Sequence, residues 1–506
     1  MKNIFKIVLF SSLMFFTSCE DELDINTDPN SPPEVNRGLV LASAQASLIT
    51  VVGGDLMNLG GFYAQYHTQA PSASQYENID QYNLNTGYAD RLWTELYAGC
   101  LNDLKYVIDE SNADGDTGTA LMGITLRAYT FQLLVDVFDD VPFTEALQGS
   151  GNISPQVTSG EEIYSALLGE IDAALAAYEA NPSPSEVGTQ DAIFQANMNH
   201  WIRFANTLKL KMYMRMSYTS MANPAAVNAL IAENNFLTTD ASFAIFGTSL
   251  NQRHPFYEVQ IATTGLGDVN NIASSSIHEF YTQNGDPRLT AAFRRNLAGS
   301  YASLPQGAGA ELAGVQARNY SRPNIGPQTP VYLMTVAESN FLQAEALIRY
   351  AGGAGAKEKY DAGVIASFTT YKSDFGFQNA DGTVNTASGP ALAQPFIAAG
   401  GAYEYTDAGS VEANVRQVMI QKWAALTYIN NIEAYIETTR TKFPEVVAEG
   451  TENYEEGNRI PSRISIFAGL AVPSIMFYPE DEVNRNPNIT QRASLTEKVW
   501  WDQKNN

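Results

Sequence analysis

Cysteine is scarce in this sequence: Cys19 and Cys100 are its two cysteines in 506 residues. If Cys19 carries an anchor, as its context below indicates, Cys100 has no partner for an internal disulfide, and no thiolate metal cluster can form. The four histidines are scattered and lack the His-x-x-x-His or His-Glu-x-x-His spacing of metal sites. We therefore expect a protein that is stabilised by its core, with no metal and no cofactor.

Basic residues are also few, with 30 Lys and Arg against 55 Asp and Glu and a net charge of −25. Removal of residues 1–18 would take away Lys2 and Lys6 and no acid, which changes the charge from −25 to −27. Nucleic-acid binding needs clustered basic residues, so we expect no nucleic-acid partner. Most of the surface should repel polyanions, which favours a neutral ligand.

Recognisable catalytic motifs are missing as well. The sequence has neither a glycine-rich phosphate loop nor the nucleophile elbow of hydrolases. Asn112, Asp114 and Asp116 start like a calcium loop, but Thr117 and Gly123 stand where that loop needs glycine and glutamate. A turn between two helices explains this string better. Acidic residues are so plentiful that a glycosidase pair stays open, although no pair stands out.

A short apolar run at the N-terminus has the features of a secretory signal. Lys2 and Lys6 precede a mostly apolar stretch that is too short to span a bilayer, and no later segment is expected to span one. Thr17 and Ser18 come directly before Cys19, as small residues do before a cleavage site. We predict a lipoprotein signal over residues 1–18, lipidation of Cys19 and an acidic tether over 19–33. The alternative is an ordinary signal peptide with a chance cysteine.

Residues 34–506 contain no linker that divides them, so we expect one mainly α-helical domain. The clearest helix runs from Thr119 to Phe138, where apolar residues recur every three or four positions. Four helical hairpins are predicted, which fits either stacked helix-turn-helix repeats or an irregular all-α domain. Their approximate ranges are 89–138, 160–219, 335–373 and 411–441.

Long segments without helical periodicity alternate with these hairpins. Loops of this length are uncommon in compact domains unless they are functional, so they predict a binding surface on a helical scaffold. The segments are Thr68–Tyr88, Thr248–Ser274, Ala298–Pro330, Phe375–Tyr405 and Lys442–Ile466.

The first candidate site lies where aromatic and amide side chains alternate, from Phe62 to Tyr88. Aromatic rings can cover the C–H face of a sugar while amides pair with its hydroxyls. Phe62, Tyr63 and Tyr66 continue a helical stripe and are expected in the core. The candidates for ligand contact are Tyr76, Asn78, Gln81, Tyr82 and Asn83.

Two further strings have a similar composition. In "ARNYSRPN" an aromatic residue stands beside two arginines, which could stack or pair with a carboxylate. "GLGDVNNIA" offers oxygen and amide groups and is a weaker candidate. The candidates from these regions are Tyr301, Asn319, Tyr320, Arg322, Asp268 and Asn270, with Asn271 beside them.

Taken in order, several strings resemble the SusD/RagB family of nutrient-binding outer-membrane lipoproteins, over nearly all of the chain after the signal. They include "SCEDELDINTDPN", "LWTELYAGCLNDLKYVI", "LLVDVFDDVPFTEAL", "WIRFANTLKLKMYMRMS", "NGDPRL", "VYLMTVAESNFLQAEAL", "VMIQKWAALTYINNIEAYIETTR" and "VWWD". The resemblance implies four tetratricopeptide-like units packed on a loop-rich half with little β structure. "CEDELD" also resembles the acidic sorting signal of surface-exposed lipoproteins in Bacteroidetes-type bacteria.

The resemblance further implies a non-enzymatic protein on the outer face of the outer membrane. Such a protein covers a SusC-like TonB-dependent transporter and holds oligosaccharides or polysaccharides, or in some members peptides, for import. Better-studied members grip sugars with loop tryptophans, whereas all five tryptophans here lie in helix-like strings or in the terminal motif. A glycan-binding role is therefore expected. A peptide-binding role, a surface glycoside hydrolase and a purely structural lid remain alternatives.

Overall fold

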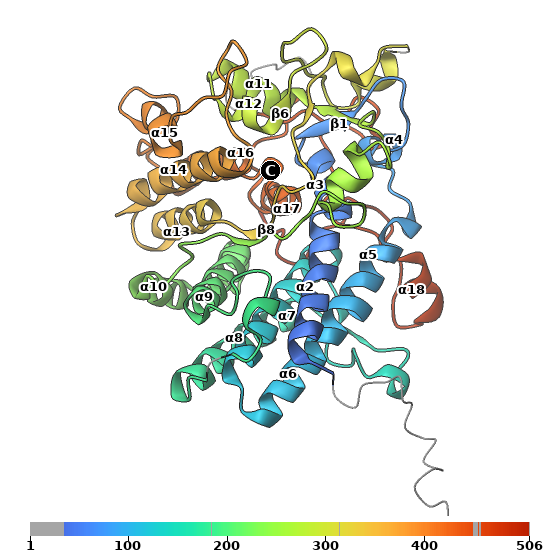
Figure 1. Ribbon diagram of the computed structural model, residues 1–506, viewed down its shortest axis with the longest axis vertical. Helices are drawn as coiled ribbons and strands as arrows, with labels where there is room; N and C mark the ends of the chain where they lie inside the picture. The colour runs from blue at the N-terminus through green and yellow to red at the C-terminus, as the bar shows by residue number, and fades with distance from the viewer. Residues whose placement is uncertain (1–34, 184, 313, 449–453, 455–456, 505–506) are drawn as a thin grey trace, which may run out of the picture.

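The computed structural model describes residues 35–183, 185–312, 314–448, 454 and 457–504 (Figure 1). The expected signal over residues 1–18, the lipidation of Cys19 and the tether over 19–33 lie outside the described residues and stay predictions.

The mainly α-helical fold is confirmed. Between α5 and α6, Glu95–Leu101 forms a π-helical turn. The α-helices are α2 (Arg37–Val52), α3 (Asp55–Tyr63), α4 (Glu77–Asp80), α5 (Asp90–Thr94), α6 (Asn102–Asp114), α7 (Thr117–Phe138), α8 (Gly160–Ala180), α9 (Met198–Arg215), α10 (Pro224–Glu233), α11 (Ser275–Gln283), α12 (Arg288–Ala292), α13 (Val336–Tyr350), α14 (Ala356–Asp374), α15 (Gly389–Ile397), α16 (Val411–Ala425), α17 (Asn431–Thr441) and α18 (Glu480–Arg485).

The β strands in the described residues form short antiparallel pairs, and a few isolated bridges such as Val446 with Arg459 add to them. The pairs are β1 (His67–Gln69) with β5 (Asn271–Ala273), β2 (Val141–Pro142) with β3 (Val157–Thr158), β4 (Ala241–Phe243) with β8 (Val331–Met334), and β6 (Phe293–Arg294) with β7 (Arg322–Pro323).

The long helices form a stack of antiparallel pairs on one side of the molecule (Figure 1). Within the pairs, α6 packs on α7, α8 on α9, α13 on α14 and α16 on α17. Contacts of α7 with α8, α9 with α13 and α13 with α16 join successive pairs. The loop-rich part, with β1, α4, α11 and α12, lies beyond the end of this stack. The scaffold is thus built from neighbouring helical hairpins.

The turn between α6 and α7 shows why the calcium-like string forms a hairpin. Gly115 ends α6 in the left-handed conformation, with φ +73°, which glycine adopts without strain. Asp116 then caps α7, because its carboxylate accepts a hydrogen bond from the Thr119 backbone N–H at 3.0 Å. Asp114 pairs with Arg37 at 3.0 Å. Capping and ion pairing thus account for the acids of this string.

Two helices pass a length and composition test for a membrane span within the described residues, which corrects the expectation that no later segment would. One is α7, and the other is Arg37–Tyr63, which comprises α2 and α3. Of the most apolar 18-residue stretch of α7, 89% is buried inside the protein. A core helix that is packed on nearly all sides is apolar all round, so composition alone does not separate it from a membrane helix.

Helix α15 lies inside Phe375–Tyr405, which the sequence analysis leaves irregular. Ser388 caps this helix, since its side chain accepts a hydrogen bond from the Ala391 backbone N–H. Pro395 stands within the helix. A proline inside a helix normally disrupts it, so the sequence pattern does not predict a helix here.

The end of α3 fastens the loop-rich part to the helical stack. Tyr66 is fully buried, and its hydroxyl donates to the backbone oxygen of Trp423 in α16. The Trp423 indole N–H donates back to the Ala64 carbonyl at 2.9 Å. Phe62 and Tyr63 are also buried, as expected for core residues. The candidate loops therefore stand on a rigid base.

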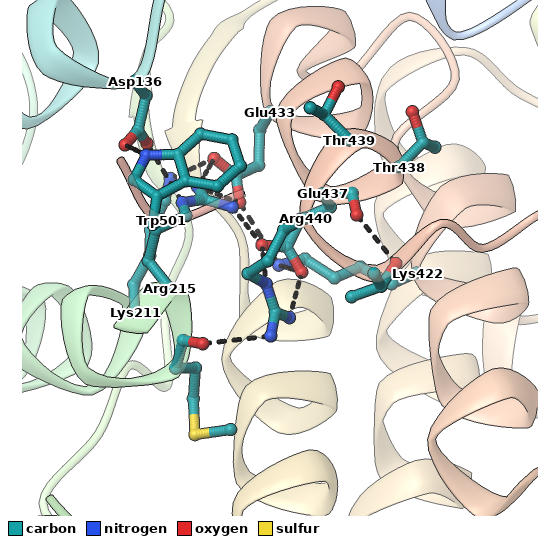
Figure 2. Close-up of polar contacts among 12 residues, drawn as sticks. Asp136, Lys211, Arg215, Lys422, Glu433, Glu437, Thr438, Thr439, Arg440 and Trp501 are labelled. Carbon is teal, nitrogen blue, oxygen red and sulfur yellow. Dashed lines mark hydrogen bonds and ion pairs between the residues drawn. The ribbon is translucent and has the colours of Figure 1, made fainter. Parts of the chain in front are cut away.

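A buried ion cluster holds five helices together (Figure 2). Arg215 of α9 has no exposed surface and pairs with Asp136 of α7 at 3.1 Å and with Glu433 of α17 at 2.9 Å. Lys422 of α16 and Arg440 of α17 both pair with Glu437, at 3.3 and 2.7 Å. Arg440 also reaches Glu345 of α13 at 2.7 Å. These opposite charges are buried together and compensate one another.

Candidate ligand site

A pocket of about 480 Å³ opens where three loop segments meet beside the β1–β5 and β6–β7 pairs. Residues 71–72 follow β1, residues 267–269 precede β5, and residues 316–322 lead into β7. Pockets of this size accommodate small organic ligands. Its lining is Pro71, Ser72, Gly267, Asp268, Val269, Gln316, Ala317, Arg318 and Arg322.

Asp268 is the electrostatic centre of this pocket. Arg294 and Arg322 face each other across the β6–β7 pair, and two like charges in that register repel. The Asp268 carboxylate bridges them, at 2.7 Å from the Arg294 Nη2 and 2.6 Å from the Arg322 Nη1. Burial raises the pKa of Asp268, and the two guanidinium groups partly offset this. One carboxylate thus holds three segments in place.

A second buried carboxylate, Asp80, holds together the segments next to the pocket. Asp80 of α4 accepts hydrogen bonds from the Thr68 hydroxyl at 2.7 Å and from the Gln69 backbone N–H at 3.0 Å, both in β1. The Gln306 amide donates to its other oxygen. Burial raises the pKa of Asp80 to about 6, while these hydrogen bonds act in the opposite direction. Asp80 therefore ties α4, β1 and the loop at 306 into one unit.

The groups left for a ligand are mostly polar. Arg318 is exposed, and its guanidinium has no hydrogen-bond or ion-pair partner within the described part of the chain. Gln316 is exposed beside it, and Val269 adds an apolar surface that is 49% exposed. The described lining contains no aromatic side chain. The pocket can therefore donate several hydrogen bonds, but it offers no ring for stacking.

Of the candidates named from sequence, Asp268 and Arg322 line this pocket. Asn270 lies beside it and is buried, where its backbone oxygen accepts a hydrogen bond from the Ala70 N–H. Its neighbour Asn271 is also buried and donates to the Asn58 side-chain oxygen at 2.8 Å. These two asparagines help to build the β1–β5 edge.

The two tyrosines of the first candidate segment lie outside the pocket lining. Tyr82 is 1% exposed, stacks on Phe467 and receives a hydrogen bond from the Ser462 N–H at 3.3 Å. Tyr82 is therefore a core residue, which corrects the expectation of an exposed ring. Tyr76 is half-buried, and its hydroxyl accepts a hydrogen bond from the Gln260 amide at 2.7 Å. Polar sequence around an aromatic residue does not establish that its ring is exposed.

The amide candidates of that segment lie on the turn around α4. Gln81 donates to Glu77 at 2.9 Å, one helical turn earlier. Asn78 and Asn83 are exposed and joined by a backbone hydrogen bond at 2.8 Å. None of the three lines the described pocket.

The remaining candidates lie in or near the string "ARNYSRPN", residues 317–324. The Tyr301 ring lies 5.1 Å under the guanidinium of Arg295, and Tyr320 packs against the small apolar cluster that includes Ala317. Asn319 is exposed, and its backbone oxygen accepts from the Asn296 amide at 3.1 Å. These contacts fix the loop that carries Arg318. Gln316 and Arg318 were missed as candidates, although Arg318 is one of the two arginines that drew attention to this string.

Comparisons with known proteins agree with this architecture. Residues 29–466 match the model of the SusD-like family, described as "Starch-binding associating with outer membrane". None of the curated proteins matches the chain.

Solved structures resemble the chain over nearly its whole length. A chitin-binding protein is similar with a TM-score of 0.70 at 22% identity, covering 92% of this chain and all of that one. A SusD/RagB family protein from Bacteroides thetaiotaomicron has a TM-score of 0.72 at 20% identity, covering 94% and 100%. A chitin-binding SusD homologue from Flavobacterium johnsoniae has 0.71 at 19%, covering 92% and 99%. Identities this low establish the fold alone.

Proposed function

The chain belongs to the SusD-like family, and we propose that it is a glycan-binding lipoprotein that captures oligosaccharides and delivers them to a SusC-like TonB-dependent transporter. The family is associated with the outer membrane, and two of the similar structures are chitin-binding proteins. In this account Cys19 carries the lipid, and the protein faces the cell exterior.

The observation that carries the proposal is the loop pocket around Asp268. Its donors are presented by loops, and the adjoining strand β1 is held to α4 by the buried Asp80 and follows Tyr66, which bonds to the helical stack. Loops on a rigid scaffold are the usual location of recognition residues. Arg318 and Gln316 would donate to sugar hydroxyls, and Val269 would contact the C–H face. Because the described lining contains no aromatic ring, affinity is expected to come mainly from hydrogen bonds.

Binding without hydrolysis follows from the same lining. A glycosidase needs two carboxyl groups several ångströms apart on either side of the scissile bond. In the described lining, Asp268 is the single carboxylate, and two arginines already hold it. We therefore propose that the ligand leaves this pocket unchanged.

Calorimetric titration tests the function. The protein is residues 20–506, because the described fold begins at residue 35. The panel contains neutral glucans, mannans, xylans, chitooligosaccharides, a uronate polymer and mixed oligopeptides. We expect enthalpy-driven binding to one neutral glycan, with affinity at least tenfold weaker in Arg318→Gln.

Arg485→Gln is the matched control, because Arg485 is an exposed arginine on α18 and lies outside the pocket lining. It should bind like the unchanged protein. Binding to peptides alone would overturn the glycan assignment. Release of shortened sugars from the mixture would overturn the non-catalytic role.

A further inference from the structure

A second pocket of about 590 Å³ is lined in part by the C-terminal end of α17 and shares no lining residue with the loop site. Helix α17 contributes Thr438 and Thr439 to the lining of this pocket (Figure 2). The same helix contributes Glu433 and Glu437 to the buried ion cluster. The lining is Glu412, Thr438, Thr439, Lys442, Phe443, Glu445, Val446, Arg459, Leu470, Ala471, Val472, Ser474, Thr496, Lys498, Asp502 and Lys504.

Four cations gather here in a strongly acidic protein, and two of them are already paired. The Lys442 ammonium lies 2.7 Å from Asp502, and the Lys504 ammonium lies 2.7 Å from Glu412. Lys498 is exposed and has no ion pair in the described residues. Burial lowers the pKa of Lys442, and the charges of Lys498 and Arg459 lower it further. The pocket therefore carries positive charge that its own carboxylates do not balance.

Arg459 is the clearest sign of a missing anion. It is 3% exposed, and within the described residues its guanidinium donates to two backbone oxygens, from Nε to Pro444 at 3.1 Å and from Nη1 to Tyr63 at 3.4 Å. Within the described chain its Nη2 makes no hydrogen bond, and burial lowers the pKa of Arg459 to about 10. A buried guanidinium without a carboxylate is costly.

Other buried arginines of this protein do not share that situation. Arg215, Arg288 and Arg440 are fully buried, and each is paired with at least one carboxylate. Arg459 is also buried but lines an open pocket. Among the described residues, Glu445 acts electrostatically on Arg459 but forms no ion pair with it, which leaves the Arg459 guanidinium open to an anion that enters the pocket.

The rest of the lining restricts what that partner can be. Leu470, Val446 and Val472 form an aliphatic surface, and Leu470 is 47% exposed. Two carboxylate oxygens, Asp502 Oδ2 and Glu445 Oε2, are buried and have no hydrogen-bond donor among the described residues. A suitable ligand thus combines an anionic group, an apolar body and an N–H group.

We propose that this second pocket binds an α-carboxylate next to an apolar side chain, as found in an apolar amino acid or at the C-terminus of a short peptide. The carboxylate would contact Arg459 and Lys498, the side chain would contact Leu470 and Val472, and an N–H would donate to Asp502 or Glu445. A guanidinium with a free edge suits a carboxylate. This inference is independent of the glycan site.

Titration with small carboxylates tests the proposal in residues 20–506. The probes are N-acetyl-leucine, N-acetyl-leucine amide, free leucine, the tripeptide Leu-Gly-Leu and glucuronate. We expect the acetylated acid to bind and its amide to bind at least tenfold more weakly. Stronger binding of the tripeptide would identify the C-terminus of a peptide as the source of the carboxylate. Stronger binding of leucine would identify a free amino acid as the source. Glucuronate, which lacks the apolar body, should not bind.

Lys498→Gln removes the exposed cation without disturbing the core. It should weaken the binding of N-acetyl-leucine at least fivefold. Lys105→Gln is the matched control, since Lys105 is also exposed and lies outside the pocket lining on α6. Arg459→Lys keeps a charge but loses the planar fork and should weaken binding further. Equal binding of acid and amide, no binding of any probe, or unchanged binding in Lys498→Gln would overturn the proposal.

Discussion

The Arg322 Nη1 lies 2.6 Å from the Asp268 Oδ2, although 54 residues separate them in the chain. This contact joins the segment before β5 to the strand β7, and the second arginine at 294 attaches β6 to the same carboxylate. One acidic side chain thus fixes the segment before β5 to both strands of the β6–β7 pair. Its removal should change binding more than stability.

Asp268→Asn should weaken glycan binding at least tenfold, because Arg294 and Arg322 would repel each other and displace the loop that carries Arg318. Stability should fall by only about 1 kcal/mol, since the ion pairs are partly exposed to solvent. Hydrogen exchange of residues 316–322 and calorimetry measure the two effects. Asp481→Asn on α18 is the exposed control. Unchanged exchange in Asp268→Asn would contradict this role.

Tyr82→Ala should destabilise the protein by about 3–5 kcal/mol, as expected for removal of a buried ring. Tyr82→Phe keeps the ring and loses only the contact with Ser462, so its cost should be about 1 kcal/mol. Urea unfolding of both variants checks this. If Tyr82→Ala left stability unchanged and abolished glycan binding, Tyr82 would be a ligand contact instead.

Arg215→Met should cost about 3–5 kcal/mol of unfolding free energy, because Asp136 would lose its ion-pair partner in the described residues and Glu433 would keep only its lysine partners. Guanidinium unfolding compared with Arg485→Gln measures the difference. A loss below about 1 kcal/mol would show that the remaining lysines and arginines compensate the cluster.

Asp80 predicts a specific pH dependence. Its folded pKa of about 6 lies above the ordinary value of 3.8, so the folded state holds this proton more tightly than the unfolded state. The stabilisation from this group is complete below pH 4 and is lost as the pH rises to about 6. The stability difference between the unchanged protein and Asp80→Asn should therefore shift by about 2.4 kcal/mol against the unchanged protein between pH 4 and 7. A constant difference over that range would contradict the raised pKa.

Helix pairs were the most predictable part of the fold. In α7 the apolar spacing is regular and Asp116 supplies the cap, so both periodicity and local chemistry indicate the same helix. Helix α15 was missed because Pro390 and Pro395 hide a nine-residue helix that is held by Ser388 and by packing on α14. Local sequence rules fail where tertiary contacts outweigh propensity.

The candidate site was only partly predictable. Asp268 and Arg322 were named as polar loop residues, but the Arg294 partner depends on the β6–β7 register, which has no local signal. Tyr82 was misjudged because its cover comes from Phe467, far along the chain. Burial of a loop aromatic is decided by distant segments, whereas a helical stripe reveals its buried face directly.

A crystal structure of residues 20–506 with the tightest-binding oligosaccharide tests the central claim most directly. The account predicts the sugar between residues 71–72, 267–269 and 316–322, with hydroxyls within hydrogen-bond distance of the Arg318 guanidinium and the Gln316 amide. A sugar that occupied another surface while this pocket held only solvent would contradict it.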